Sequence, residues 1–240
     1  MPFLIVLVAF IALCISVYLK SPTTKGKIGE LRIKKLIGKT VPEEKYIIND
    51  LVLETENGRT CQIDHIVINE RGIFVIETKN YSGRIYGQEH QQEWTQVLKY
   101  GKVKNKFYNP IKQNNTHIYH LAHHLSCQLP IHSAVVFVQG NTYYIDASDV
   151  FTPRELKRFL KEGEDVLSIE QMESAYDELL NADQIDISDD EHIQNIRKMK
   201  RLIALNVCPR CGKALVKRHG KHGGFYGCSG YPSCKFTKKL

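Results

Sequence analysis

The chain has 240 residues, 42% of them hydrophobic, which suits one medium-sized domain and a small accessory module. Its net charge of +7 is uneven: from Cys208 onward there are eight Lys or Arg and no Asp or Glu, so the rest of the chain is nearly neutral. Seven cysteines, three of them scattered (Cys14, Cys61 and Cys127), exclude a disulfide framework and indicate a reducing compartment.

The first predicted element is an apolar segment from Phe3 to Leu19 that contains no charged residue. As a helix rising about 1.5 Å per residue, it would span roughly 26 Å, at the short end of what crosses a bilayer core. It lacks the basic start and the small-residue cleavage site of a signal peptide, and the polar stripe of a buried soluble helix. We therefore expect a single-pass transmembrane anchor over residues 1–20.

The charges that flank this segment predict its orientation. Lys20, Lys25 and Lys27 follow it, and no Lys or Arg precedes it. Because basic residues are retained on the cytoplasmic side, the soluble part should face the cytoplasm from the cell membrane. That location agrees with reduced cysteines.

The next stretch predicts a helix followed by strands. Apolar residues recur with helical spacing over 26–38, where Gly38 is a suitable stop. Asn57-Gly58 is a strong turn signal between two alternating segments, which indicates a hairpin. The predicted strands are 46–54, 60–68, 73–79, 83–86 and 94–98.

The remainder of the predicted domain alternates helices and one buried strand. A helix opens at Asn109-Pro110 and runs to about residue 126, and a strand follows at 131–138. Thr152-Pro153 opens another helix, with Thr at the cap and Pro in the first turn. This order predicts an α/β fold with a mixed sheet flanked by helices. Residues 162–206 are helical and charged, and we expect a peripheral spacer there.

An acidic pair and a lysine stand on the hairpin strands. Because side chains alternate along a strand, Asp64 and Glu77 should lie close together, with Lys79 on the same face as Glu77. Such carboxylates are costly to bury for structure alone, and they suit Mg²⁺ or Mn²⁺, which would hold a phosphate and activate water. On spacing alone, however, an ordinary charge pair of Glu77 and Lys79 at a solvated sheet end is the favoured interpretation.

A family resemblance favours the metal site over the ordinary charge pair. Residues 26–125 resemble the nuclease-related domain (NERD) family. The matching segments are Gly26-Lys27-Ile28-Gly29-Glu30, Gln62 to Ile68, Gly72 to Lys79, Trp94, Asn109-Pro110 and Gln113. The family is grouped with the PD-(D/E)xK, restriction-endonuclease-like fold. The resemblance therefore implies a core sheet flanked by helices and a metal-dependent phosphodiesterase site.

The same resemblance assigns roles to individual residues. It implies that Asp64 and Glu77 are ligands of magnesium or manganese and that Lys79 is the catalytic lysine. It makes Glu30 an additional acidic residue that reaches the metal, and Gln113 a polar residue that supports the site. A glutamine on the helix surface is an equal alternative for Gln113.

Histidines near these residues are not expected to be ligands. His65 should point to the opposite face from Asp64, as a packed or exposed histidine. Four histidines recur on the helix that opens at Asn109-Pro110, and a solvated helix face is the favoured interpretation. They are His117, His120, His123 and His124.

The C-terminal segment has the ligand pattern of a zinc ribbon. Cys208 and Cys211 form a first pair, and Cys228 and Cys234 form a second. Sixteen residues separate Cys211 from Cys228. Two cysteine pairs on tight turns can enclose a tetrahedral, structural Zn²⁺, whose binding would supply much of the folding free energy of so small a core. Unliganded cysteines or a redox motif are the alternatives.

This segment, over residues 207–239, also resembles the four-cysteine zinc ribbon of bacterial type IA DNA topoisomerases. The resemblance implies binding to DNA, particularly to single strands. A solubilising tail is the other explanation for its basic charge. We expect Tyr226 and Tyr231 to stack on bases, and Phe225 to pack in the core. The residues expected to contact phosphate are Lys217, Arg218 and Lys221.

The predicted organisation is an anchor (1–20), a nuclease-related domain (26–161), a helical spacer (162–206) and a zinc ribbon (207–240). The expected function is a membrane-anchored, Mg²⁺- or Mn²⁺-dependent nuclease that hydrolyses DNA and needs no small-molecule cofactor. The alternative is a DNA-binding or DNA-tethering membrane protein that keeps a nuclease-like scaffold without catalysis. An RNA substrate stays open.

Overall fold

A computed structural model describes residues 21–56, 58–183, 202–203, 205–209, 211–220, 223–234 and 236–239. The predicted anchor at 1–20 lies outside these residues, as does the second part of the predicted spacer, from 184 to 201. Within the described ranges, no helix combines the length and the apolar character needed to cross a bilayer. The chain divides into two compact units, the second of which holds the C-terminal ribbon, and each is described by itself.

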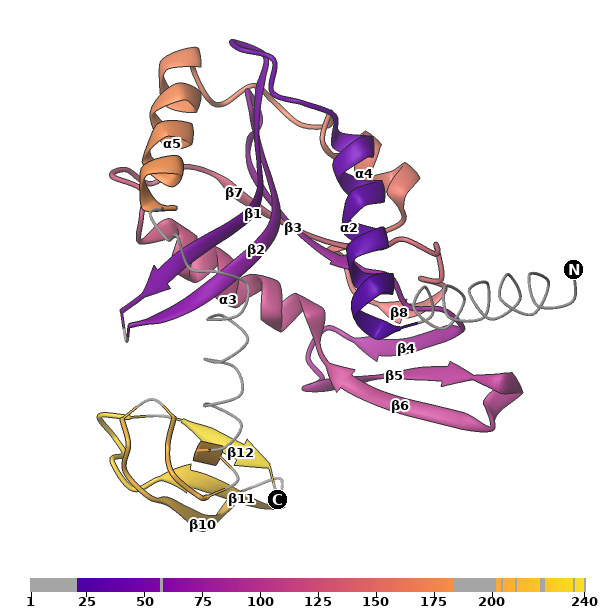
Figure 1. The fold of residues 1–240 in the computed structure, drawn as a ribbon, viewed down its shortest axis with the longest axis vertical. Helices are drawn as coiled ribbons and strands as arrows, with labels where there is room; N and C mark the ends of the chain where they lie inside the picture. The colour runs from indigo at the N-terminus through magenta and orange to yellow at the C-terminus, as the bar shows by residue number, and fades with distance from the viewer. Residues whose placement is uncertain are drawn as a thin grey trace, which may run out of the picture. The chain divides into compact units, whose positions relative to one another are not determined.

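The first unit is built on a five-stranded mixed sheet with the strand order β1-β2-β3-β7-β9 (Figure 1). The strands are β1 (Lys45–Thr55), β2 (Arg59–Asn69), β3 (Gly72–Lys79), β7 (Ile131–Phe137) and β9 (Val150–Phe151). β3 pairs antiparallel with β2 and parallel with β7, and β9 continues the parallel part. The predicted mixed sheet is confirmed.

Helices cover both faces of this sheet, as the α/β prediction required. Helices α2 (Pro22–Ile37) and α4 (Pro153–Phe159) lie on one face, and α3 (Pro110–Ala122) and α5 (Ile169–Ala182) on the other (Figure 1). Side chains alternate along β3 and so contribute to the hydrophobic cores on both faces of the sheet. Phe74 and Ile76 pack toward α2 and α4, and Ile73 packs toward α3 and α5. The sheet is therefore held between two hydrophobic layers.

Side-chain caps explain where the helices begin. The Ser21 side chain accepts a hydrogen bond from the Thr24 backbone N–H, so α2 starts four residues before the predicted position. Asn109 caps α3 in the same way, with Pro110 in the first turn, as predicted. At α4, Thr152 forms a reciprocal capping box with Glu155.

The structure differs from the predicted spacer over its first part. Met172, Ala175 and Leu179 of α5 are buried against the sheet, because their spacing places them along one side of the helix. The charged residues that suggested a peripheral spacer lie on the other sides. Residues 162–183 therefore belong with the first unit.

A second sheet of four strands, in the order β6-β5-β4-β8, lies beside the first (Figure 1). Its strands are β4 (Arg84–Gln88), β5 (Glu93–Leu98), β6 (Val103–Tyr108) and β8 (Tyr144–Asp146). On one face of this sheet, Trp94 and Ile85 pack against Ile111 and Phe137. Gly87 is required under the Trp94 ring, because a Cβ there would lie 2.2 Å from Trp94 Cδ2.

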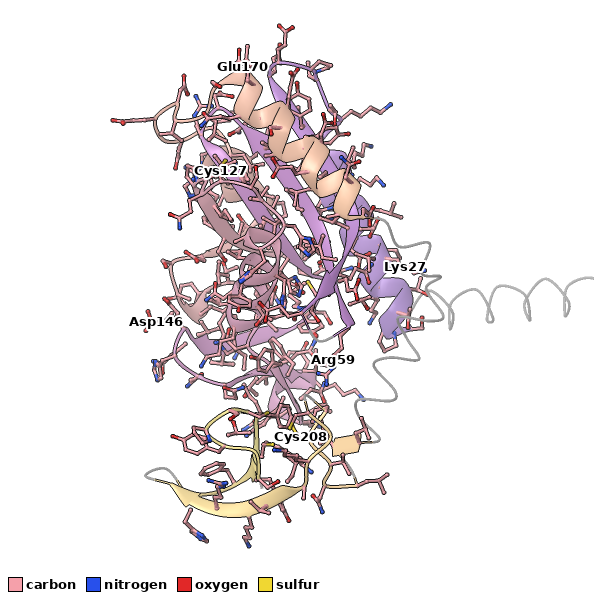
Figure 2. The ribbon with its side chains drawn as sticks, turned by 90° about the vertical axis from the view of Figure 1, so that its left-hand side faces the viewer. Lys27, Arg59, Cys127, Asp146, Glu170 and Cys208 are labelled. Carbon is pink, nitrogen blue, oxygen red and sulfur yellow. The ribbon has the colours of Figure 1, made fainter. Side chains whose placement is uncertain are left out.

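The second unit contains a three-stranded antiparallel sheet. Its strands are β10 (Leu215–Gly220), β11 (Gly223–Cys228) and β12 (Thr237–Lys239). Among the ribbon residues that the structure describes, the hydrophobic cluster buries Cys208, Leu215 and Cys228, two of which are candidate metal ligands. Figure 2 labels Cys208 within this ribbon.

Candidate functional site

Asp64 and Glu77 meet where β2 and β3 separate. The register that pairs His65 with Ile76 brings them to adjacent positions on the two strands. Asp64 Oδ2 accepts a hydrogen bond of 2.7 Å from the backbone N–H of Thr78. Glu77 is only 2% exposed. Two acidic side chains are thus held together in a largely buried position, as predicted. His65, on the other face of β2, is a packed histidine, also as predicted.

Lys79 connects the acidic pair to helix α3. Its ammonium contacts Glu77 Oε1 and donates a second hydrogen bond of 3.0 Å to Gln113 Oε1. Lys79 is mostly buried, so the Glu77–Lys79 pair is not the solvated charge pair that spacing alone favoured. Gln113 faces the site and is not a glutamine of the helix surface.

Helix α3 is fixed to the sheet by a buried asparagine. The Asn114 side-chain amide donates hydrogen bonds of 2.9 Å to the Val75 carbonyl and 3.0 Å to Ser133 Oγ. These bonds tie α3 to both β3 and β7 and set its rotation. Gln113, next to Asn114, is therefore directed at Lys79.

Glu30 reaches the same cleft from helix α2. A Cβ at Gly29 would lie 2.7 Å from Asn80 Cβ, so glycine permits the close approach of α2 to the segment after β3. Asn80 holds the helix there, because its amide donates a 2.7 Å hydrogen bond to the Lys25 carbonyl. Of the Gly-Glu pair that marked the family resemblance, Gly29 thus permits the packing of α2, and Glu30 lines the cleft.

Glu30, Asp64, Glu77 and Lys79 line one cleft of about 420 Å³, and its charge balance is acidic. Burial, and then the neighbouring Glu77, raise the pKa of Asp64 well above its usual range. Burial, with Asp50 and Glu77, also raises the pKa of Glu30. Burial on its own would lower the pKa of Lys79, but Glu77 outweighs it and raises that pKa, so Lys79 is a cation at neutral pH.

His117 is a site residue that the sequence analysis missed. It is 8% exposed, and its Nδ1 lies 3.7 Å from Glu77 Oε2. Neither atom has a hydrogen-bond partner among the described residues. The predicted solvated face is therefore wrong at this position. The signal was its spacing of four residues after Gln113, which places both on the same side of α3.

The donor set fits a divalent cation. Glu77 has a buried oxygen without a hydrogen-bond partner among the described residues, and Asp64 and Glu30 have raised pKa values. Burying this negative charge costs free energy, and a bound Mg²⁺ or Mn²⁺ would compensate for it. Asp64, Glu77 and Glu30 all line this cleft and are the carboxylates that could hold such an ion.

Asp64→Asn should stabilise the metal-free protein, by on the order of 1 kcal/mol at neutral pH. The folded-state pKa of Asp64 is raised, so this group destabilises the fold increasingly as pH rises above its unfolded pKa of about 3.9. Asparagine can still accept the Thr78 hydrogen bond. Urea unfolding of parent and variant at several pH values measures the difference, which should shrink toward acidic pH. A variant less stable than the parent at neutral pH would contradict this description.

The four cysteines of the ribbon also converge. Their sulfur atoms all lie within 4.8 Å of one another, with 3.7 Å between Cys208 and Cys234 and 3.3 Å between Cys211 and Cys228. A tetrahedral Zn²⁺ with Zn–S bonds of about 2.3 Å separates its sulfurs by about 3.8 Å. The cysteines therefore fit a structural zinc ion, as the sequence predicted.

The basic and aromatic residues of the ribbon are divided between two faces of its sheet. Arg218 lies over the exposed Tyr231 ring, 5.6 Å from its centroid, and both line a groove of about 430 Å³. Phe225 also lines this groove, so the prediction that it packs in the core is wrong. Tyr226, one residue later, packs on the core side, near Lys238.

Of the two further residues predicted to contact phosphate, the structure describes Lys217. Lys217 is exposed and pairs across the strands with Tyr226, which places it on the Tyr226 face of the sheet. Lys221 lies outside the described residues. The structure thus joins Arg218 and Tyr231 and leaves Lys217 on the other face.

Comparison with known proteins identifies both parts of the chain. Residues 25–138 match the model of the nuclease-related domain family. Residues 206–240 match the family described as the topoisomerase DNA binding C4 zinc finger. The chain therefore contains a nuclease-related domain and a topoisomerase-type zinc ribbon, as its sequence predicted. No solved structure matches the chain significantly.

Individual relatives match one part each. An uncharacterized protein of Bacillus anthracis is 44% identical over 116 residues, which cover 48% of this chain and 54% of that protein. DNA topoisomerase 1 of Methanocaldococcus jannaschii is 50% identical over 34 residues, or 14% of this chain and 4% of that enzyme. The uncharacterized protein YrdD of Escherichia coli is 58% identical over 33 residues, 14% of this chain and 18% of that protein. The chain thus spans about half of the first relative and small parts of the others.

Proposed function

We propose that this chain, which carries a nuclease-related domain followed by a topoisomerase-type zinc ribbon, is a membrane-anchored, metal-dependent nuclease that hydrolyses DNA. The observation that carries the proposal is the position of Lys79, held between Glu77 and Gln113 in a cleft that Glu30 and Asp64 also line. A sheet end with this donor set is the arrangement expected of a restriction-endonuclease-like phosphodiesterase.

Each residue has a task that follows from its contacts. Asp64 and Glu77 would hold Mg²⁺ or Mn²⁺, and that ion would supply an activated water and bind the scissile phosphate. The Lys79 ammonium, a cation at neutral pH, can stabilise charge that develops on the phosphoryl oxygens. Gln113 holds Lys79 in place from α3, and Glu30 adds a carboxylate from α2.

The zinc ribbon supplies a second contact to the substrate. Its groove joins the Arg218 cation to the exposed ring of Tyr231, a combination suited to a phosphate and an unpaired base. This favours single-stranded DNA. Lys217 and Lys221 add basic charge to the ribbon.

The location follows from the N-terminal sequence. The uncharged segment from Phe3 to Leu19, with lysines after it, supports a single-pass anchor in the cell membrane and a cytoplasmic soluble part. Alkaline extraction of membranes tests the anchor, because an integral protein stays in the pellet. Protease treatment of sealed vesicles tests the orientation.

The activity is tested with the full-length chain in detergent. Labelled single-stranded DNA, duplex DNA and RNA are incubated with Mg²⁺ or Mn²⁺, beside the Lys79→Ala variant. Metal-dependent cleavage of DNA by the parent and not by the variant supports the nuclease. DNA binding without cleavage, and without Mn²⁺ binding, would instead favour a tethering protein that keeps the scaffold. Cleavage of RNA alone would reassign the substrate.

His117→Phe should lower the cleavage rate and the Mn²⁺ affinity roughly 10- to 100-fold, as do residues that support metal ligands. Phenylalanine fills the volume but removes the ring nitrogen that faces Glu77 Oε2. Initial rates and Mn²⁺ titration by electron paramagnetic resonance measure the two effects. His90→Phe is the matched control, because His90 is exposed in the turn between β4 and β5. Unchanged values in His117→Phe would exclude this role.

A further inference from the structure

The open face of the second sheet carries aromatic and basic side chains in two adjacent rows. In one row Tyr144 pairs with Tyr86, which pairs with Thr95 and then Lys106. In the next row Arg84 pairs with Val97, which pairs with Lys104. Because Ile85 and Trp94 fill the opposite face, these rows look away from the hydrophobic core. The residues Arg84, Tyr86, Lys104, Lys106 and Tyr144 are called the sheet platform below.

The two tyrosines of the platform already form a stacking surface. Their ring centroids are 4.7 Å apart at an interplanar angle of 22°, and the side chains are 38% and 42% exposed. The Arg84 guanidinium carbon lies 5.9 Å from the Tyr144 ring centroid. A flat, exposed aromatic pair with a cation beside it offers a base a π-face and its phosphate a charge.

A hollow of about 690 Å³ extends the platform toward the β5–β6 turn. Arg84, Lys99 and Lys104 are among its lining residues, and none of the lining residues is acidic. Tyr100 stands fully exposed in that turn. It and Lys99 have φ values of 55° and 49°, which non-glycine residues adopt at a cost, and this backbone presents the Tyr100 ring to solvent.

The hollow borders the acidic cleft at one residue. Leu98 lines both, and Gln96, one of the cleft residues, donates a 2.9 Å hydrogen bond to the Ser82 carbonyl beside Gly83 of the hollow. The platform and the acidic cleft thus lie on opposite sides of β5, because Gln96 alternates with Thr95 and Val97, and the two meet at Leu98. A strand that lies along the hollow and passes Leu98 would reach the cleft that Lys79 lines.

We propose that the sheet platform, with Lys99 and Tyr100, binds single-stranded nucleic acid and directs it to the cleft. Bases stack on Tyr86, Tyr144 and Tyr100, and phosphates lie against the neighbouring cations. Single strands are specified because base faces are hidden in a duplex. The inference rests on the proposed function in taking nucleic acid as the ligand, but it assigns binding to the first unit without the ribbon.

The test measures binding without cleavage, so that it does not depend on catalysis. Fluorescein-labelled oligo(dT) is titrated with the full-length chain in buffer without added Mg²⁺ or Mn²⁺, and in a Tyr231→Ala background that weakens the ribbon. The joint change of Tyr86 and Tyr144 to alanine should weaken binding about tenfold or more, whereas the joint change to phenylalanine should leave it within about threefold. Tyr119→Ala, an exposed tyrosine on α3, is the control and should have no effect.

Photo-crosslinking of the unmodified chain to an iodouracil oligonucleotide gives an independent result. The inference expects crosslinked peptides from β4, β8 or the β5–β6 turn. Crosslinks confined to the ribbon, equal losses with alanine and phenylalanine, or equal competition by duplex DNA would each overturn it. Binding that follows these expectations in a chain that never cleaves DNA would refute the nuclease proposal alone.

Discussion

Glu77→Gln should reduce metal-dependent DNA cleavage by about 10³-fold or more. Glu77 is where the site converges: one carboxylate oxygen contacts the Lys79 ammonium, and the other faces His117 and has no hydrogen-bond partner in the described part of the chain. Glutamine keeps the shape and removes the charge that would bind the cation. Single-turnover rates on labelled DNA measure the loss, and Mn²⁺ titration should show weakened binding. Cleavage near the parental rate would remove Glu77 from the site.

The same substitution should also lower the free energy of unfolding of the metal-free protein, by about 3 kcal/mol. The Glu77 side chain is 3% exposed and that of Lys79 is 14% exposed, so Glu77→Gln leaves a buried cation without its counter-charge. Asp64→Asn is expected to stabilise, since burial and then repulsion by Glu77 disfavour the charged form of Asp64, and asparagine can still accept the backbone hydrogen bond. Two neighbouring carboxylates should therefore give opposite changes in stability while both variants lose activity.

A surface pair provides the control for this contrast. Glu70 forms an ion pair with Arg71, and the Glu70 side chain is 36% exposed, against 3% for that of Glu77. Glu70→Gln should change stability by less than about 1 kcal/mol and leave cleavage unaltered. If Glu77→Gln and Asp64→Asn shifted the unfolding midpoint in the same direction, the electrostatic description of the cleft would be wrong.

The central strands were predictable because their signals are local. Alternating or continuous apolar residues bounded by Asn57-Gly58 and by Gly72 identify β2 and β3 without any tertiary information. β6, β8 and β9 were not predicted, because they are short or carry mainly polar residues and gain their partners from distant parts of the chain. α5 was misjudged for a similar reason, since only docking on the sheet shows which of its sides is buried.

The candidate site was predictable where it depends on the hairpin and not where it depends on the packing of α3. The hairpin register alone brings Asp64 to Glu77, whereas Gln113 and His117 depend on the rotation of α3, which Asn114 sets through contacts with β3 and β7. The histidines of α3 show this limit, because His117 is the buried one among the four. In the ribbon, neighbouring strand residues face opposite sides of the sheet. Tyr226 therefore packs against the core and Phe225 lines the groove, the reverse of what was predicted.

Removal of zinc, or Cys228→Ser, should unfold the ribbon and leave the first unit folded. In the described part of the ribbon, the hydrophobic cluster buries Leu215 and two cysteines, with a few partly buried residues packed against them, and so small a core does not offset the entropy of ordering the segment. Zinc binding to such sites contributes about 10–16 kcal/mol of apparent free energy, which the unliganded ribbon forfeits. Among the described residues, the hydrophobic clusters of the first unit are formed by residues of that unit. Limited proteolysis should therefore remove the ribbon and spare residues up to about Asp183.

Zinc content separates this prediction from a general loss of stability. The parent should contain one zinc ion per chain, Cys228→Ser essentially none, and Cys127→Ser one, because Cys127 is an exposed thiol outside the cluster. The affinity of Cys228→Ser for oligo(dT) should fall to the part contributed by the sheet platform, since the groove around Arg218 and Tyr231 is built on the zinc-held turns. A protease-resistant ribbon in Cys228→Ser would show that packing, and not the metal, holds the second unit together.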